Sequence, residues 1–264
     1  MRMMTGPGMI MTLNISNNKS TVIERGVYYF ELLNYPHITE LELNKIIAFI
    51  RYEKSCGRQT AIVCENGDIV SVINSAVAHL DTTEDILPLA ENEFVYHATD
   101  TNASRKILSD GKLLSAAKVY GKTGEELSFE KRGSPWNDPA DYFDYIMFCW
   151  GDNMTGDYVF LSENFPSEED LLKGNFDAGI RFYFRYGDII RHPGRVFDGY
   201  HAIKVKDEIV LSDYLHSCIV PEQYKDELEG HILPGLATRV RYLSQNGLGI
   251  SDWNKKVYGF VSKL

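Results

Sequence analysis

Apolar residues recur at helical spacing in the segment 39–54, TELELNKIIAFIRYEK. Positions i, i+3, i+4 and i+7 lie on one face of a helix, so apolar residues there predict an amphipathic helix. The residues at those positions are Leu43, Ile46, Ile47 and Ile50. Thr39 and Glu42 have the spacing of a capping box, in which each side chain binds the other residue's backbone N–H. The pattern therefore predicts a helix that begins just after Thr39.

Apolar runs flank this helix on both sides, GVYYFELL at 26–33 and TAIVCENGDIVSVI at 60–73. The first is typical of a β-strand. Asn66-Gly67 divides the second run and predicts a hairpin, because a type I′ turn needs two residues that tolerate positive φ. The acidic segment 78–93 then predicts a domain boundary near residue 90. We therefore expect a small α/β domain over residues 1–90, with a disordered start at about residues 1–12.

A new pattern begins after the boundary, with the strand FVYHAT at 94–99 and a short helix that Gly111 ends. The long stretch 115–157 is irregular, and long loops inside compact domains are often functional. Within it, DYFDYIMFCW at 141–150 fits either a helix or a buried strand. The pattern leaves that choice open.

Short strands with few helices are expected from there to the end of the chain. The expected strands are DYVFLS (157–162), GIRFYFRYGDII (179–190), GYHAIKV (199–205), DEIVLS (207–212) and CIV (218–220). The expected helices are PSEEDLLKG (166–174), PEQYKDELEG (221–230), with Pro221 in its first turn and Gly230 at its end, and a C-terminal segment at 250–264. This order predicts a second domain, residues 91–264, of the α+β class with mainly antiparallel strands.

Composition narrows the functional classes. The chain has 264 residues, 44% of them hydrophobic, and no apolar run near the roughly 20 residues of a membrane span. The N-terminal segment lacks the features of a signal peptide, so we expect a cytoplasmic protein. A net charge of −10 disfavours a broad nucleic-acid-binding surface but permits a small local basic site. The four cysteines show no metal-ligand spacing, and we expect reduced thiols and no metal site.

Several common catalytic motifs are missing. The sequence contains no phosphate-binding loop of the GxxxxGK[ST] type, no GxGxxG after a strand, no HExxH and no GxSxG. What remains is an ordered set of expected strand ends: VYHAT at 95–99, YVFLSE at 158–163 and EIVLS at 208–212.

This ordered set resembles the ADP-ribosyltransferase superfamily, in particular its His-type branch, which includes diphtheria-toxin-like and poly-ADP-ribose-polymerase enzymes, rifampin ADP-ribosyltransferases and RNA 2′-phosphotransferases. The resemblance covers roughly residues 94–230. It implies a split, mostly antiparallel β core with flanking helices and a cleft for NAD. It also implies a glycosyltransferase reaction, in which ADP-ribose passes from NAD to an acceptor and nicotinamide is released.

The chemistry requires a few kinds of residue. The bond between ribose C1′ and nicotinamide breaks through an oxocarbenium-like centre, which a nearby carboxylate stabilises. By resemblance, Glu208 is the catalytic acid and His97 binds a ribose hydroxyl. The remaining residues that the resemblance assigns to NAD are Ala98, Thr99, Tyr158, as an aromatic wall for nicotinamide, and Ser162, with Arg185 and Arg191 as candidates for its pyrophosphate.

Alternatives stay open at three of these positions. Taken alone, His97 is more typical of a strand-end histidine bonded to a backbone carbonyl, because structural histidines are commoner than ligand-binding ones. Asp207 competes with Glu208, and because strand side chains alternate, only one of the two acids can face a given cleft. Tyr120 competes with Tyr158 for the nicotinamide wall.

Two other functions remain possible at this stage. An RNA 2′-phosphotransferase would use basic residues for its phosphate, and RYGDIIRHPGR at 185–195 supplies several. A non-catalytic module on the same fold would bind a nucleotide or a partner. Members that modify arginine carry a second acid two residues before the catalytic one, where this chain has Lys206. This departure argues against an arginine acceptor, and the sequence leaves the acceptor unassigned among protein, nucleic acid and small molecule.

Overall fold

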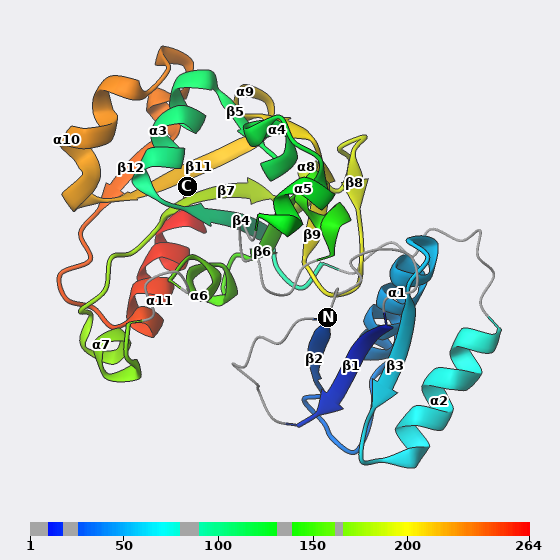
Figure 1. Ribbon diagram of the computed structural model, residues 1–264. Coiled ribbons are helices and arrows are strands. Elements are labelled where there is room, and N and C mark those ends of the chain that lie inside the picture. The colour runs from blue at the N-terminus through cyan, green and yellow to red at the C-terminus, as the bar shows by residue number, and fades with distance from the viewer. Residues whose placement is uncertain (1–9, 18–25, 80–89, 131–138, 162–165) are drawn as a thin grey trace. The chain divides into compact units, whose positions relative to one another are not determined.

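The chain is an α+β protein with two compact units. The computed structural model describes residues 10–17, 26–79, 90–130, 139–161 and 166–264. The smaller unit comprises 1–89, 120–144 and 196–201, and the larger unit comprises 90–119, 145–195 and 202–264. Figure 1 shows the elements of both. No helix among the described residues is long and apolar enough to cross a membrane.

A three-stranded parallel sheet in the order β2-β1-β3 forms the centre of the smaller unit. The elements of this unit are β1 (Ile10–Ser16), β2 (Val27–Glu31), α1 (Glu40–Ser55), β3 (Gln59–Val63), α2 (Gly67–Ala78), α5 (Gly124–Phe129) and η1 (Ala140–Asp144). The strand expected from GVYYFELL is confirmed as β2. The expected disorder at 1–12 concerns mostly residues outside the described part, and β1 begins at Ile10.

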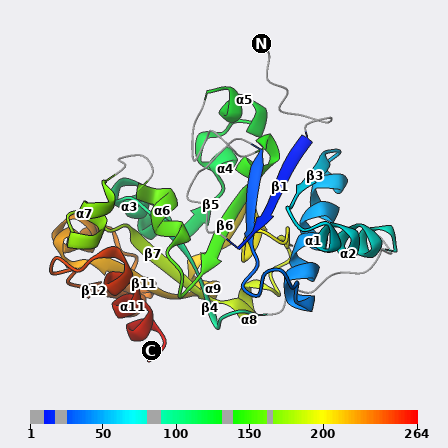
Figure 2. The same cartoon turned by 90° about the horizontal axis from the view of Figure 1, so that it is seen from below.

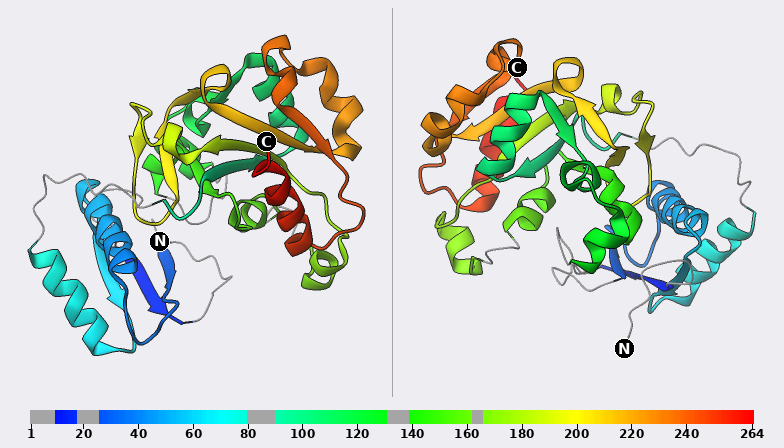
Figure 3. Two further views of the ribbon diagram at one scale, coloured as in Figure 1. Left: turned by 180° about the vertical axis from the view of Figure 1, so that it is seen from behind. Right: turned by 45° about the horizontal axis from the view of Figure 1, so that its top comes forward.

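Helix α1 confirms the predicted amphipathic helix and its capping box. The Thr39 backbone N–H donates to the Glu42 carboxylate at 2.8 Å, and Glu42 N–H donates to Thr39 Oγ1 at 3.2 Å. The helix covers one face of the sheet, as the view from behind shows (Figure 3), and its Phe49 ring packs 4.9 Å from that of Tyr28 in β2. Gly199 lies so close to α1 that a Cβ atom there would meet the Lys45 carbonyl oxygen at 2.0 Å.

The predicted hairpin at Asn66-Gly67 is wrong. Asn66 is the N-cap of α2, and its side-chain oxygen accepts hydrogen bonds from the backbone of Asp68 and Ile69. Asparagine favours helix N-caps as well as tight turns, since its side chain can replace a missing backbone partner in both. The apolar run that follows is helical, with Ile69 and Ile73 buried four residues apart.

The larger unit contains a seven-stranded sheet and a two-stranded sheet. The seven strands have the order β12-β11-β7-β4-β6-β9-β8, and β5 pairs with β10. Its strands are β4 (Phe94–Thr99), β5 (Lys112–Leu114), β6 (Tyr145–Trp150), β7 (Ile180–Arg185), β8 (Arg195–Val196), β9 (Ile203–Lys206), β10 (Glu208–Val210), β11 (Leu215–Pro221) and β12 (Val240–Leu243). The pairing is mixed but mostly antiparallel, with β11 and β12 parallel.

Helices cover both faces of the large sheet. They are α3 (Thr101–Asp110), α4 (Ala116–Tyr120), α6 (Thr155–Leu161), α7 (Glu168–Lys173), α8 (Tyr186–Ile189), α9 (Leu211–Tyr214), η2 (Glu222–Tyr224), α10 (Lys225–Leu228), η3 (Glu229–His231), η4 (Pro234–Arg239) and α11 (Ile250–Val261). Figure 2 views the sheet from the side of α6, α7 and α11, while α3 and α10 lie on the other side.

The two faces of the sheet carry separate cores. The face that we call the Val95 face packs Val95 and Phe182 against Leu108 of α3 and Ile209 of β10. The opposite face, which we call the Tyr96 face, carries Phe94, Tyr96 and Tyr183 and packs against Trp253 of α11. Side chains alternate along a strand, so successive residues of β4 enter different cores.

Several local predictions are confirmed and three need correction. The strand at 94–99, the helix that Gly111 ends in a left-handed conformation (φ 67°), the acidic helix and the C-terminal helix are all present. The predicted strand DYVFLS is wrong, because 155–161 form α6. The open segment 141–150 divides into a 3₁₀ turn and β6. Pro221 closes β11 instead of opening a regular helix, and Gly230 lies inside η3 instead of ending one.

Candidate functional site

His97 lies on β4, in the middle of the large sheet and on its Val95 face. Its strand partner in β7 is Phe182. The ring of Phe148 from β6 lies edge-on to the imidazole, with 6.4 Å between the ring centroids. The apolar run before His97 makes β4 a central strand, and the histidine is its first residue that is only half-buried.

The hydrogen bonds of His97 define its tautomer. Nδ1 lies 3.2 Å from the carbonyl oxygen of Met147, which can only accept, so Nδ1 carries the proton. Burial lowers the pKa of His97, and the hydrogen bond to Met147 offsets only part of this decrease. The ring is therefore neutral near pH 7. Nε2 therefore presents a lone pair. The backbone bond expected of an ordinary strand-end histidine is present, and it leaves Nε2 as an acceptor.

Ala98 and Thr99 complete β4 and fall on opposite faces. Ala98 packs against the Tyr96-face core, and Thr99 pairs with Ile180 at the end of the strand. Asp100 then caps α3, with its carboxylate accepting from Ala103 N–H at 2.7 Å. The cap fixes the direction in which the chain leaves the strand, directly after Thr99.

The C-terminal ends of β4 and β9 lie at the same edge of the large sheet. Both strands are antiparallel to β6, which lies between them. Tyr145, the first residue of β6, pairs with Lys206, the last residue of β9. The ladder between β4 and β6 covers Val95 and Tyr96, which pair with Trp150 and Cys149. The C-terminal ends of β4 and β9 therefore point in the same direction, on either side of β6.

Glu208 is the first residue of β10 and lies two positions after Lys206, the last residue of β9. Its two carboxylate oxygens accept from Lys112 Nζ of β5 at 3.1 and 3.2 Å. Both side chains are about half exposed, at 47% for Glu208 and 43% for Lys112. Ile209 points into the Val95-face core, and Glu208 lies on the opposite, solvent-facing side of β10.

Asp207 differs from Glu208 in its backbone. Its φ of 66° places it in the left-handed region, so it belongs to neither β9 nor β10. Its carboxylate lies 4.0 Å from Lys118 Nζ, and its side chain is 44% exposed. The two competing acids are therefore both accessible, and each has a lysine beside it.

Tyr158 is placed on the other side of the sheet from His97. It belongs to α6, which packs on the Tyr96 face, where Gly156 approaches the Tyr96 ring so closely that a Cβ would meet it at 3.0 Å. The Tyr158 side chain is exposed. Ser162 lies outside the described residues, and Tyr120 ends α4 with an exposed ring. The described contacts therefore bring neither Tyr158 nor Tyr120 to His97.

The two arginines expected to bind pyrophosphate each have an acidic partner. Arg185 is the last residue of β7, pairs with Phe94 at the end of β4 remote from Thr99, and forms an ion pair with Glu93. Arg191 forms an ion pair with Asp188 at 2.6 Å. Helix α8 separates the two arginines in the chain.

Sequence reasoning missed a buried polar network on the Tyr96 face. Arg181 donates to both carboxylate oxygens of Asp157, from Nε at 3.0 Å and from Nη2 at 2.7 Å. Tyr96 also donates to Asp157, and Arg181 donates to Asn254 of α11 at 2.9 Å. Burial raises the pKa of Asp157, and the guanidinium opposes this rise. The network joins α6 and α11 to the sheet.

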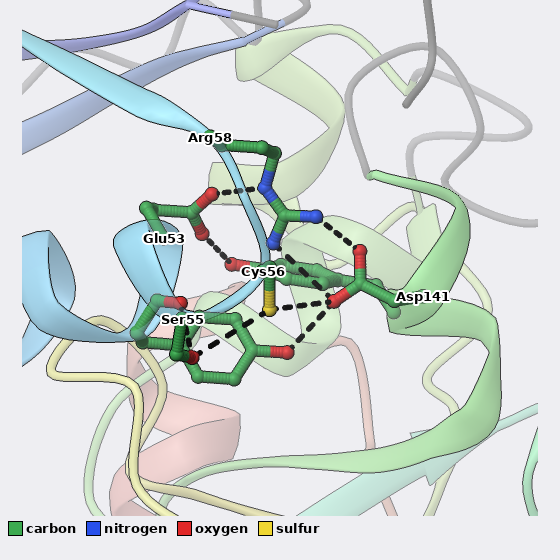
Figure 4. Close-up of polar contacts among 7 residues, drawn as sticks. Glu53, Ser55, Cys56, Arg58 and Asp141 are labelled. Carbon is green, nitrogen blue, oxygen red and sulfur yellow. Dashed lines mark hydrogen bonds and ion pairs between the residues drawn. The ribbon is translucent and has the colours of Figure 1, made fainter. Parts of the chain in front are cut away.

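A second missed network lies in the smaller unit (Figure 4). Arg58 forms ion pairs with Glu53, which is fully buried, and with Asp141. Cys56 donates its thiol to the same Asp141 carboxylate at 3.6 Å, and Tyr142 donates to Glu53 at 3.1 Å. The Arg58 guanidinium lies between Glu53 of α1 and Asp141 of η1, so the cluster connects these two elements. Partners more than 80 residues apart leave no spacing signal in the sequence.

Comparisons with known proteins do not assign the chain to a family. No protein-family model matches the chain, and no curated protein or solved structure matches it either. The four cysteines are free thiols, and the described residues hold no group of three or more potential metal ligands. Function is therefore argued from the chain's own residues.

A shallow polar depression also lies in the larger unit. Its lining comes from residues 174–177, Gln223 and 245–247. Only one ionisable side chain, that of Asp177, is among them. It contains none of the residues expected to bind NAD.

Proposed function

We propose that the larger unit transfers ADP-ribose from NAD to an acceptor and releases nicotinamide. On this proposal its seven-stranded and two-stranded sheets correspond to the split β core of the ADP-ribosyltransferase family. The observation that carries the proposal is that β4, which contains His97, and β9, which leads into Glu208, run in the same direction on either side of β6. The two strands, more than 100 residues apart in the chain, follow the order that the resemblance implies.

His97 has the properties of a ligand-binding residue and lacks those of a general acid. Its Nδ1 proton is held by the Met147 carbonyl, so Nε2 can accept a hydrogen bond from a ribose hydroxyl. Burial lowers its pKa, which keeps the ring uncharged and the acceptor lone pair available at neutral pH. The role proposed for it is to orient NAD.

Glu208 supplies the negative charge that the reaction needs. An ionised carboxylate near ribose C1′ stabilises the positive charge that develops as nicotinamide leaves, and it can orient the attacking acceptor. Lys112 donates hydrogen bonds to both of its oxygens. The exposed position of Glu208 leaves it accessible to a substrate.

The proposal keeps His97, Thr99 and Glu208 and leaves out Tyr158 and Arg185. Helix α6 covers the face opposite His97, and Arg185 lies at the remote end of the strands. RNA 2′-phosphotransfer receives less support, since the ion pairs of Arg185 and Arg191 already occupy the arginines that such a phosphate would need.

Labelled NAD tests the proposal and its acceptor together. The purified full chain is incubated with NAD labelled in the adenosine half, in a cell extract that contains protein, DNA and RNA. We expect nicotinamide release and transfer of label to one of the three. Absence of nicotinamide release in that extract contradicts the proposal. If RNA loses phosphate and no nicotinamide is released, the chain catalyses a different reaction.

A further inference from the structure

The chain changes sheets within a single residue just before Glu208. Lys206 is the last residue of β9 in the seven-stranded sheet, and Glu208 is the first residue of β10 in the two-stranded sheet. Asp207 alone lies between them. Its φ of 66° is a conformation that residues with a Cβ rarely adopt, and aspartate tolerates it better than most.

Backbone hydrogen bonds hold this turn from both sides. Lys206 N–H donates to the Gly194 carbonyl at 2.8 Å, and Ser115 N–H donates to the Asp207 carbonyl at 2.8 Å. At the far end of β10, Leu211 N–H donates to the Gly111 carbonyl at 2.9 Å. The left-handed residue is therefore fixed between two sheets, and β10 is attached to β5 along its whole length.

The side chain of Asp207 is much less constrained than its backbone. Its contact with Lys118 Nζ is 4.0 Å long and about half exposed on both sides. Contacts of this length and exposure contribute little. By contrast, the Glu208 carboxylate that follows is held by Lys112 through both oxygens.

We infer that Asp207 positions Glu208 through its left-handed backbone, and that its carboxylate takes no part in the reaction. This inference rests on the proposed function for the identity of the reaction. The turn sets the direction of β10, and with it the side on which the Glu208 carboxylate meets Lys112. A residue that cannot adopt positive φ rotates the start of β10 and displaces the carboxylate.

Three substitutions at position 207 separate the backbone from the side chain. Asp207→Gly and Asp207→Asn remove the carboxylate but accept positive φ, and we expect kcat for nicotinamide release within about threefold of wild type. Asp207→Val is β-branched and disfavours positive φ, so we expect kcat to fall by roughly tenfold to a hundredfold, as misplacement of a catalytic group does. The KM for NAD, which reports on His97, changes little in all three.

Asn246→Val is the matched control. Asn246 is the other non-glycine residue with positive φ among the described residues, at 50°, and it lies in the loop between β12 and α11. Its substitution introduces the same kind of strain into the larger unit without touching β10. We expect its kcat to equal that of wild type, so an effect specific to Asp207→Val does not come from general destabilisation.

Crystal structures of the variants give a second readout that needs no activity. The Lys112 Nζ to Glu208 distance should stay near 3.1 Å in Asp207→Gly and be lost in Asp207→Val. The inference is overturned if Asp207→Val keeps that contact, or if Asp207→Asn and Asp207→Gly are as slow as Glu208→Gln. An inactive wild type with the expected distances would instead count against the proposed function alone.

Discussion

At the scale of single residues, the structure turns His97 from a common strand-end histidine into one with a defined protonation state. The sequence alone predicts that it lies in the strand 94–99, which is correct. It cannot predict that the Met147 carbonyl holds Nδ1, because that partner comes from a different strand 50 residues away. The tautomer follows from this bond, and the proposed binding role follows from the tautomer.

Stability should depend on pH through His97. Its folded pKa lies below the unfolded value of about 6.5, so the unfolded state binds the proton more readily. The contribution is fully present above about pH 6.5 and is lost as the pH falls from there through the lower folded pKa. We expect the drop in Tm between about pH 7.5 and pH 5.5 to be smaller in His97→Asn, which cannot titrate, than in wild type. Equal drops in the two proteins would contradict the assigned burial.

Glu208→Gln should leave the fold almost as stable as wild type. The pair with Lys112 is about half exposed, and such surface pairs contribute between 0 and about 1 kcal/mol. Chemical denaturation should therefore show a loss in the free energy of unfolding of less than about 1 kcal/mol. A larger loss would mean that the carboxylate has a structural role, and an activity defect in this variant would then have two possible causes.

At the scale of elements, the sequence predicts best where the signal is local. The capping box at Thr39 and Glu42 and the glycine end of α3 depend on residues within one turn, and both are correct. The hairpin predicted at Asn66-Gly67 is wrong because an asparagine side chain suits both a tight turn and a helix N-cap. The strand predicted at 157–162 is wrong: an aromatic run fits a strand, but residues 155–161 form α6, from which Asp157 pairs with Arg181.

The cap of α2 can be tested directly. Asn66→Ala removes the acceptor for the N–H groups of Asp68 and Ile69. We expect a loss of about 0.5–2 kcal/mol in the free energy of unfolding, as for other N-cap substitutions. Asn66→Ser is the control and should recover most of this loss. If Asn66→Ala is as stable as wild type, the side chain does not cap the helix.

The buried pair on the Tyr96 face should be far more sensitive. Arg181→Met leaves Asp157 buried without its cation, and breaking such a pair from one side costs about 3–5 kcal/mol. The double variant Asp157→Leu with Arg181→Met removes both charges and should be clearly more stable than Arg181→Met alone. Thermal unfolding of the two variants measures the difference, and equal losses would contradict a coupled pair.

At the scale of the whole molecule, the sequence predicts the α+β class but not how the chain builds its units. Residues 120–144 and 196–201 belong to the smaller unit although they follow parts of the larger one in the chain. Asp141 reaches Arg58, and Gly199 packs against α1. These contacts join segments that share no motif, so the sequence pattern does not predict them.

The net charge of the chain does not describe the charges around the candidate site. The net charge of −10 describes the whole chain, whereas Lys112 and Lys118 lie beside Glu208 and Asp207, where β9 of the large sheet leads into β10 of the two-stranded sheet. The candidate site therefore has a local charge balance of its own. Its residues come from β4, β5 and β10, which the fold assembles within the larger unit.

The central claim is that Glu208 makes the larger unit release nicotinamide from NAD, and one rate comparison tests it most directly. Purified full-length wild type, Glu208→Gln and Glu227→Gln are compared; Glu227 is similarly exposed and paired with Arg105 at 2.6 Å, which makes it the matched control. We predict release by wild type and the control, and a rate lower by roughly a hundredfold or more in Glu208→Gln. Equal release by all three proteins would contradict the account.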